Sequence, residues 1–138
     1  MNSSTDLSTA SENAIAGVLS PTILRYFETL NAEAFQLTAR LFAETGKLYP
    51  PFEGAIVGQE AIAAYLEKEA RGMKVLPREG VLQTAEAGTT EIKVMGKVQT
   101  ALFSINVSWH FKLDAQAKIL TAQVKLLAAL EELLSLQK

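Results

Sequence analysis

The chain has 138 residues, of which 49% are hydrophobic and 20% are charged, and its formal net charge is −2. This length is enough for one domain with a hydrophobic core, and the small net charge provides no basic surface for nucleic acid. Because the sequence contains no cysteine, disulfides, zinc–thiolate sites and thiol nucleophiles are excluded, which fits a cytoplasmic location. No apolar run approaches the roughly 20 residues of a membrane-spanning helix.

The Ser- and Thr-rich residues 1–19 predict a flexible N-terminal arm without the features of a signal peptide, although "ENAIAGVL" within it is compatible with a short helix. The folded domain is expected to cover residues 20–138. Ser20 and Pro21 predict the start of a first helix, as its N-cap and first-turn residue. The core-facing stripe of this helix has helical spacing and consists of Ile23, Tyr26, Phe27 and Leu30.

Asn31 follows this helix and can cap a second one, which we predict over about residues 33–45, ended by Gly46. Residues 47–58 are predicted to be extended, because they contain a Pro-Pro pair. A third helix is expected over about residues 59–71. The residues that share one face of it are Ile62, Tyr65, Leu66 and Glu69.

From residue 73 onward the hydrophobic pattern changes to period two, which predicts four or more antiparallel strands joined by short turns. Residues 114–118 form the clearest hairpin connection, and Gly96 is the best candidate for a β-bulge. The final segment, "ALEELLSLQK", predicts a terminal helix. Helices followed by a long antiparallel sheet predict an α+β fold, in which the helices and a strongly bent sheet form a cone with an apolar mouth.

The segment "NVSWHF" (106–111) places the single tryptophan, Trp109, on the apolar face of a predicted strand, just as Tyr26 lies on the apolar face of the first helix. Each side chain ends in a polar tip that donates a hydrogen bond and carries no charge at neutral pH. A buried donor without an acceptor costs roughly 1–3 kcal/mol. A neutral ligand oxygen would suit both donors, although ordinary core packing is the commoner explanation of aromatic residues in such stripes.

Catalysis has little support in the sequence. The only histidine, His110, falls on the polar face of its strand, while Asp6 lies in the N-terminal arm and Asp114 in a turn. Glu69 is the one carboxylate expected on a partly apolar face. An ordinary exposed position beside a basic neighbour explains its presence there better than a catalytic role does. No metal-ligand spacing occurs. We therefore expect no enzyme; the alternatives are an isomerase or dehydratase that uses Glu69 or Tyr26, and a structural dimerisation module.

Four segments of the chain occur in a distinctive order: "LRYFETLNAEAF", "LYPPFEGAIVGQEAI", "GKVQTALF" and "NVSWHF". Together they resemble the C-terminal domain of the orange carotenoid protein, in the nuclear-transport-factor-2-like superfamily, over residues 20–138. The resemblance implies a non-covalently bound ketocarotenoid of the echinenone or canthaxanthin type, whose keto oxygen accepts hydrogen bonds from Tyr26 and Trp109. It also implies an apolar tunnel for the polyene, lined by Leu30, Val57, Met73, Leu102, Phe103, Val124 and Leu126.

The resemblance further implies how such a protein would act. It would be a soluble carrier that takes up carotenoid, with transient membrane contact, and holds it across a homodimer. It would deliver the carotenoid to helical carotenoid-binding partner proteins and provide photoprotection by quenching singlet oxygen. Glu69 matches an acidic residue that contacts the helical partner. Ala101-Leu102 replaces a Pro-Trp pair of the light-sensing relatives, which opens the tunnel mouth, and Lys125 stands where an acidic residue is expected.

Overall fold

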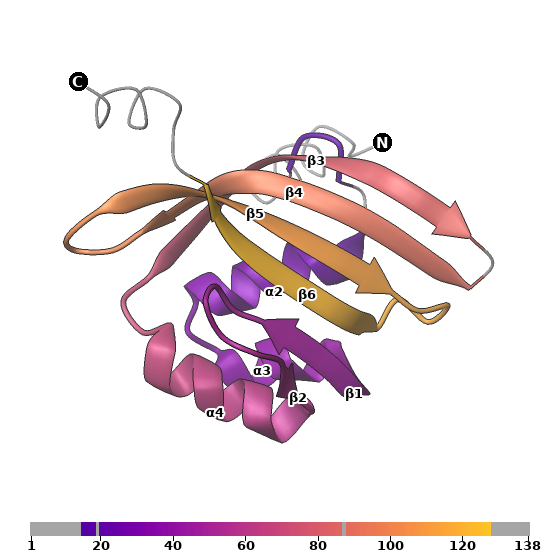
Figure 1. Cartoon of the computed structure of the whole chain (residues 1–138), viewed down its shortest axis with the longest axis horizontal. Coiled ribbons are helices and arrows are strands. Elements are labelled where there is room, and N and C mark those ends of the chain that lie inside the picture. The colour runs from indigo at the N-terminus through magenta and orange to yellow at the C-terminus, as the bar shows by residue number, and fades with distance from the viewer. Residues whose placement is uncertain (1–14, 19, 87, 128–138) are drawn as a thin grey trace, which may run out of the picture.

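The structure is a computed structural model that describes residues 15–18, 20–86 and 88–127. In this part of the chain three helices lie on one face of a bent six-stranded sheet (Figure 1). The helices are α2 (Pro21–Asn31), α3 (Phe35–Arg40) and α4 (Gln59–Glu69). The strands are β1 (Phe42–Tyr49), β2 (Ile56–Val57), β3 (Lys74–Glu86), β4 (Thr89–Gln99), β5 (Ser104–Leu113) and β6 (Ile119–Leu127). The predicted α+β fold is therefore confirmed.

The strands of the sheet follow the order β2-β1-β6-β5-β4-β3. All neighbouring pairs are antiparallel except β1 and β6, which are parallel. The antiparallel pairing predicted for the strands after residue 72 is confirmed for β3 to β6, and the parallel pair involves β1, a segment that the sequence does not assign to these strands. A parallel pair requires a long connection, and here everything from β2 to β5 separates β1 from β6 along the chain.

The first helix forms as its sequence predicts. The Ser20 side chain accepts a hydrogen bond from the backbone N–H of Ile23 at 3.5 Å, and Pro21 occupies the first turn. At the other end, the Asn31 side chain accepts from the N–H of Val75 at 2.7 Å and donates to its carbonyl at 2.9 Å. This residue therefore ties the end of α2 to the start of β3.

The predicted second helix over residues 33–45 is wrong. Helix α3 covers only Phe35–Arg40, and the chain continues directly into β1 (Phe42–Tyr49). Pairing with β6 and burial of apolar side chains such as Phe42 override the helical pattern of this segment. Gly46 does not end a helix but lies inside β1, where an added Cβ would come within 2.6 Å of the carbonyl oxygen of Ile119.

The long strands confirm the predicted period-two pattern, and the hairpin at residues 114–118 is also confirmed. Its ends are joined by a hydrogen bond of 2.8 Å from the N–H of Asp114 to the carbonyl of Lys118. The first of these strands, β3, runs without interruption over Lys74–Glu86.

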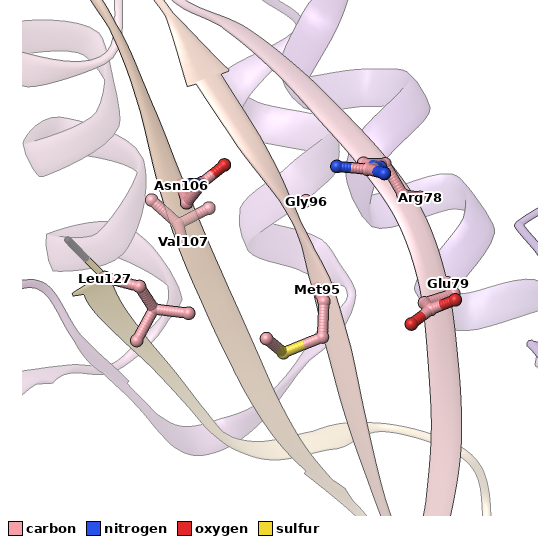
Figure 2. Close-up of a pocket in the computed structure, with 7 residues that line it drawn as sticks. All are labelled: Arg78, Glu79, Met95, Gly96, Asn106, Val107 and Leu127. Atoms are coloured by element: carbon pink, nitrogen blue, oxygen red, sulfur yellow. The ribbon is translucent and has the colours of Figure 1, made fainter. Parts of the chain in front are cut away.

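The predicted bulge at Gly96 is in fact on the partner strand. Pro77 pairs with Gly96 and Glu79 pairs with Met95, so the extra residue is Arg78 in β3. Gly96 permits this, because an added Cβ would lie only 2.3 Å from the carbonyl oxygen of Leu76. Bulges increase the local bend and twist of a sheet. On the face away from the helices this region forms a pocket of about 360 Å³, the outer-face pocket, lined by residues of β3, β4, β5 and β6 (Figure 2).

Residues 15–18 lie against the edge of the sheet, although the sequence predicts a flexible arm there. The carbonyl of Ala16 accepts a hydrogen bond of 2.8 Å from the N–H of Gly80 in β3, and Ile15 and Val18 are each only 5% exposed. The other residues of the predicted arm, and the terminal helix predicted over 129–138, lie outside the described residues. Within the described residues no helix exceeds the 11 residues of α2 and α4, too few to cross a bilayer.

Candidate ligand-binding cavity

A cavity of about 170 Å³, here called the inner cavity, lies between α2, α4 and the sheet. Most of its wall is apolar, and the polar atoms come from two tyrosines, one tryptophan and one glutamate. The lining residues are Tyr26, Leu30, Leu48, Pro50, Pro51, Tyr65, Leu66, Glu69, Ala70, Met73, Val75, Val98, Trp109 and Val124.

Tyr26 is held in the middle of α2 by a cluster of aromatic rings. Its ring meets Phe27 and Phe111 edge-on, with centroid distances of 5.2 and 5.0 Å, and is tilted against Phe42 at 6.3 Å. Such edge contacts are favourable beyond the area that they bury. Because the side chain is only 2% exposed, this packing fixes the position of its hydroxyl group.

Trp109 lies in the middle of β5 and is 1% exposed. Its backbone is held on both sides, since it pairs with Val94 of β4 and Val124 of β6. The indole ring packs edge-on against Phe27 at a centroid distance of 4.8 Å. Phe27 therefore contacts both Tyr26 and Trp109, and one aromatic cluster positions the two donors.

The polar tips of Tyr26 and Trp109 face the inner cavity. Among the hydrogen bonds between described residues, none involves the Tyr26 hydroxyl or the Trp109 indole N–H. No polar atom of a buried side chain in the described part is sealed off without a partner, so both tips retain access to open space. The space that both residues line is the inner cavity. The structure thus brings together two donors for which it supplies no acceptor of its own among the described residues.

The two donors are electrically neutral over the physiological range. Burial raises the pKa of the Tyr26 hydroxyl above its usual value of 10.0, with a smaller contribution from the nearby Tyr65. The indole of Trp109 does not titrate and only donates. Together they suit an uncharged acceptor oxygen better than an anionic one, because none of the described residues that line the inner cavity carries a positive charge to compensate a buried anion.

A tyrosine and two carboxylates lie where the cavity meets solvent. The hydroxyl of Tyr65 donates to a carboxylate oxygen of Glu53 at 3.3 Å. Burial and the charge of Glu53 raise the pKa of Tyr65 to about 12, and Glu69 contributes less. Glu69 is exposed at the end of α4. It forms no ion pair with a described residue, and the nearby Arg71 pairs with Glu67 instead.

A second, open depression adjoins the inner cavity. This mouth groove, with a volume of about 520 Å³, shares Pro50, Pro51 and Val124 with the inner cavity. The remaining lining residues are Tyr49, Phe52, Glu53, Gln123, Lys125 and Leu126. The two cavities are therefore neighbours, and these three shared residues lie where they meet.

The structure brings together part of the predicted site. Of the nine predicted ligand contacts, the inner cavity is lined by Tyr26, Trp109, Leu30, Met73 and Val124, and by the predicted partner contact Glu69. The other four are exposed to different degrees and lie outside this cavity: Val57 (50%), Leu102 (90%), Phe103 (57%) and Leu126 (38%). Leu126 lines the mouth groove instead.

Sequence reasoning missed several cavity residues. Tyr65 was assigned to an apolar helix face together with Glu69, and this pairing could have indicated that its hydroxyl also reaches the cavity. Pro50 and Pro51 were interpreted only as stiffening an extended segment. Their contribution to both cavities depends on the path of the β1–β2 loop, which no local pattern reveals.

The remaining ionisable candidates lie away from the inner cavity. His110 is on the outer face of β5, as predicted, with its Nε2 atom 3.1 Å from a carboxylate oxygen of Glu91. Asp114 accepts hydrogen bonds from backbone N–H groups of its own hairpin turn, and Asp6 lies outside the described residues. Among the described residues no cluster of three or more metal-binding side chains occurs.

The chain matches known proteins over most of its length. The model of the nuclear transport factor 2 (NTF2) domain matches residues 18–123. The orange carotenoid-binding protein of Synechocystis sp. is 39% identical over 134 residues, which is 94% of this chain and 42% of the relative. The chain therefore spans less than half the length of this relative.

Two solved structures are similar to this chain, one in sequence and fold and the other in fold alone. The structure of the orange carotenoid protein of Anabaena (Nostoc) sp. binding canthaxanthin is 40% identical, with a TM-score of 0.80 over 88% of this chain and 40% of that protein. The epoxide hydrolase/cyclase-like enzyme SalBIII, at 18% identity over 76% of this chain and 87% of that protein with a TM-score of 0.59, shows a similarity of fold alone. The match corresponds to the C-terminal domain of the orange carotenoid protein, and the chain belongs to the NTF2 domain family.

Proposed function

We propose that this chain binds a ketocarotenoid non-covalently, with the keto oxygen of one terminal ring between Tyr26 and Trp109. The observation that carries the proposal is the pair of neutral donors that line one apolar cavity and have no acceptor among the described residues. A ring carbonyl is an uncharged acceptor on an otherwise hydrocarbon molecule, so it matches both properties. The similar protein from Anabaena, which binds canthaxanthin, supports the same ligand class.

The size of the inner cavity limits how much of such a ligand it holds. Its volume of about 170 Å³ is below the roughly 300–1,000 Å³ of cavities that enclose a drug-sized ligand. A terminal ring is the part of a carotenoid that fits this scale. The polyene would leave past Val124 into the mouth groove, where Leu126 provides further apolar surface.

A homodimer would cover the part of the pigment that leaves the cavity. Apolar surface left in water costs about 25 cal/mol for each Å², so a long polyene outside one subunit is strongly unfavourable. A carotenoid with a keto ring at each end would allow two identical subunits to bind one end each, related by a two-fold axis. The exposed apolar residues at the rim, Phe103 and Leu126, would then be buried against the pigment and the second subunit.

A carrier role follows from the open mouth. The mouth groove beside the inner cavity is open to solvent, and an incompletely enclosed ligand favours release to another protein. In this proposal the recipients are helical carotenoid-binding proteins in the cytoplasm, and the exposed carboxylate of Glu69 at the cavity edge is the contact for a basic partner residue. The bound polyene supplies the light absorption and the quenching of singlet oxygen.

The proposal is tested by producing the chain in cells that make a ketocarotenoid. Wild-type protein should be purified as a coloured complex, and the double variant Tyr26→Phe/Trp109→Phe should bind the pigment about tenfold to hundredfold more weakly, because two hydrogen bonds contribute about 1–3 kcal/mol. Residual absorption should be shifted to the blue.

Tyr65→Phe is the matched control for the double variant. It also removes a hydroxyl group from the cavity wall, but that group already donates to Glu53, so colour and affinity should stay close to wild type. Colourless wild-type protein, or a double variant with unchanged affinity and spectrum, would contradict the proposed function.

A further inference from the structure

Two apolar side chains stand out from the surface at the tips of separate turns. Phe52, in the loop between β1 and β2, is 93% exposed, and Leu102, in the hairpin between β4 and β5, is 90% exposed. Among the exposed large apolar residues of the described chain no other exceeds 58%. Single apolar residues with moderate exposure are ordinary, but two almost fully exposed ones on turn tips need an explanation.

Both turns lie at the end of the sheet where the cavity opens. Phe52 lines the mouth groove together with Leu126. Leu126 pairs with Val107 near the start of β5, and β5 begins directly after the turn that carries Leu102. The β4–β5 hairpin extends at this end of the sheet in Figure 1. The two tips therefore project beside the same opening.

The Leu102 turn satisfies its own backbone groups. The N–H of Thr100 donates to the carbonyl of Phe103 at 2.8 Å. The hydroxyl oxygen of Thr100 accepts from the N–H groups of Leu102 and Phe103, both at 3.2 Å. Unpaired backbone groups are the main obstacle to placing a turn in an apolar medium. This turn has therefore already paired the N–H groups of its two apolar residues.

The Phe52 turn has few backbone donors to satisfy. Pro50 and Pro51 have no N–H, and the N–H of Glu53 donates to the carbonyl of Pro50 at 3.4 Å. Phe52 has a φ of 67°, which is rare for a bulky residue. The turn thus holds the phenyl ring away from the protein in a backbone conformation that the ring does not favour.

Basic side chains accompany the two turns. Lys125 is exposed and lines the mouth groove beside Phe52, and Lys97 is exposed on β4 shortly before the Leu102 turn. In the part of the chain that the structure describes, neither lysine forms an ion pair. The one acidic residue of the Phe52 turn, Glu53, is exposed and accepts a hydrogen bond from the Tyr65 hydroxyl, so its carboxylate can stay at the level of the head groups when the Phe52 tip enters the hydrocarbon. Long basic side chains beside apolar tips can reach the anionic head groups of a lipid layer while the tips enter the hydrocarbon.

We propose that the turns at residues 50–53 and 100–103 insert into the surface of a lipid bilayer, so that the mouth groove opens on the hydrocarbon. An apolar ligand could then enter without crossing water. This inference rests on the proposed function for the identity of the ligand. The competing occupant is a second copy of this chain, but two isolated apolar tips on separate turns, with lysines nearby, fit a fluid, anionic surface better than a rigid protein face.

Vesicle co-sedimentation tests the insertion without any pigment. Wild-type chain should bind vesicles of phosphatidylglycerol and phosphatidylcholine, and the variant Phe52→Ser/Leu102→Ser should bind at least about tenfold more weakly, since both apolar side chains are lost. The matched control is Val81→Ser/Leu82→Ser, which changes two apolar residues that are 58% and 57% exposed on β3. This control should bind as wild type does.

A fluorescent probe reports the position of each tip. Because the chain has no cysteine, Leu102→Cys gives a unique site for a polarity-sensitive dye, and Val81→Cys gives the control site. The dye at position 102 should shift to the blue on vesicles, and the dye at position 81 should not. Equal shifts at both sites, or no vesicle binding by wild type, would overturn the inference.

Pigment uptake separates this inference from the proposed function. The Phe52→Ser/Leu102→Ser variant should lose at least about tenfold more of its canthaxanthin uptake rate from vesicles than from ethanol, because only uptake from vesicles requires insertion. If wild type binds no pigment from either source, the proposed function fails, while co-sedimentation still tests the insertion. A variant that binds vesicles normally but loses self-association by light scattering would show that a second copy covers the turns instead.

Discussion

Tyr26 and Trp109 place two hydrogen-bond donors against an apolar cavity, with no acceptor among the described residues. No buried polar side-chain atom of the described part is sealed off without a partner, so both donors can still be hydrated. The aromatic cluster around Phe27 holds both residues in place. A ligand that displaced this water without offering an acceptor would leave buried donors unpaired, at roughly 1–3 kcal/mol each, so the two donors select a ligand that carries an oxygen.

The raised pKa of Tyr26 leads to a prediction about alkaline stability. The folded chain keeps the Tyr26 proton at pH values where the unfolded chain, with its tyrosine pKa near 10.0, releases it. Its contribution to stability is therefore complete below pH 10 and is lost as the pH rises above that value, with a slope of about 1.4 kcal/mol per pH unit. Denaturation curves in urea between pH 8 and pH 11.5 would measure this slope.

The variant Tyr26→Phe provides the comparison for this measurement. All other ionisable groups are the same in both proteins, so the difference between the two profiles belongs to Tyr26. The stability of the variant should fall less steeply above pH 10. Parallel profiles for wild type and variant would show that the hydroxyl is not buried as described.

For single residues, the sequence predicted that Tyr26 and Trp109 face inward, but it did not predict all the residues around them. Periodicity places Tyr26 and Trp109 on inward faces, and the need of each polar tip for an acceptor identifies them as candidates. The exposed position of Leu102 could not be predicted in the same way. It depends on the shape of a turn, whereas the family resemblance indicated only that the residue lies near the ligand path.

The segment from residue 33 to 49 shows how an element prediction fails. Its sequence has helical spacing, yet only α3 forms, and β1 takes the remainder because β6 offers a partner strand and the core accepts its apolar side chains. Local propensity differs between such states by tenths of a kcal/mol per residue. Pairing and burial contribute more, and neither is visible before the partner strand is known.

Gly96 correctly indicated a bulge at its level of the sheet but not the strand that contains it. The glycine indicated a bulge, and the structure has one at that level of the sheet, but the extra residue is Arg78 of the neighbouring strand. A sequence shows where a backbone approaches closely, since only glycine fits there. It does not show which of two paired strands carries the additional residue.

The variant Gly96→Ala tests this close approach. An added Cβ would lie 2.3 Å from the carbonyl oxygen of Leu76 and 2.7 Å from the Cα of Pro77, so β3 must shift. The free energy of unfolding should fall by about 1–3 kcal/mol, as measured by urea denaturation.

Gly54→Ala is the control for this substitution. An added Cβ at Gly54 meets no atom within 4 Å, so the change in stability should stay within about 0.5 kcal/mol. Equal stability of the Gly96 and Gly54 variants would contradict the tight packing of β3 against β4 at the bulge.

At the scale of the whole molecule, the bent sheet and the helices enclose the inner cavity between them. The aromatic cluster with both donors lies at the inner cavity, and the mouth groove lies next to it. The two exposed apolar turns lie at the same end of the sheet as the mouth groove. The family resemblance predicted this fold. The resemblance did not predict how far the rim residues stand out from the surface, because loop geometry depends on local backbone contacts such as those of Thr100.

The most direct test of this account is an experimental structure of the chain with canthaxanthin bound. One ring oxygen should lie within hydrogen-bond distance, about 2.7–3.2 Å, of both the Tyr26 hydroxyl oxygen and the Trp109 Nε1 atom, with the polyene running past Val124 into the mouth groove. A pigment bound only in the outer-face pocket of Figure 2, or a ring oxygen that contacts neither donor, would contradict the account.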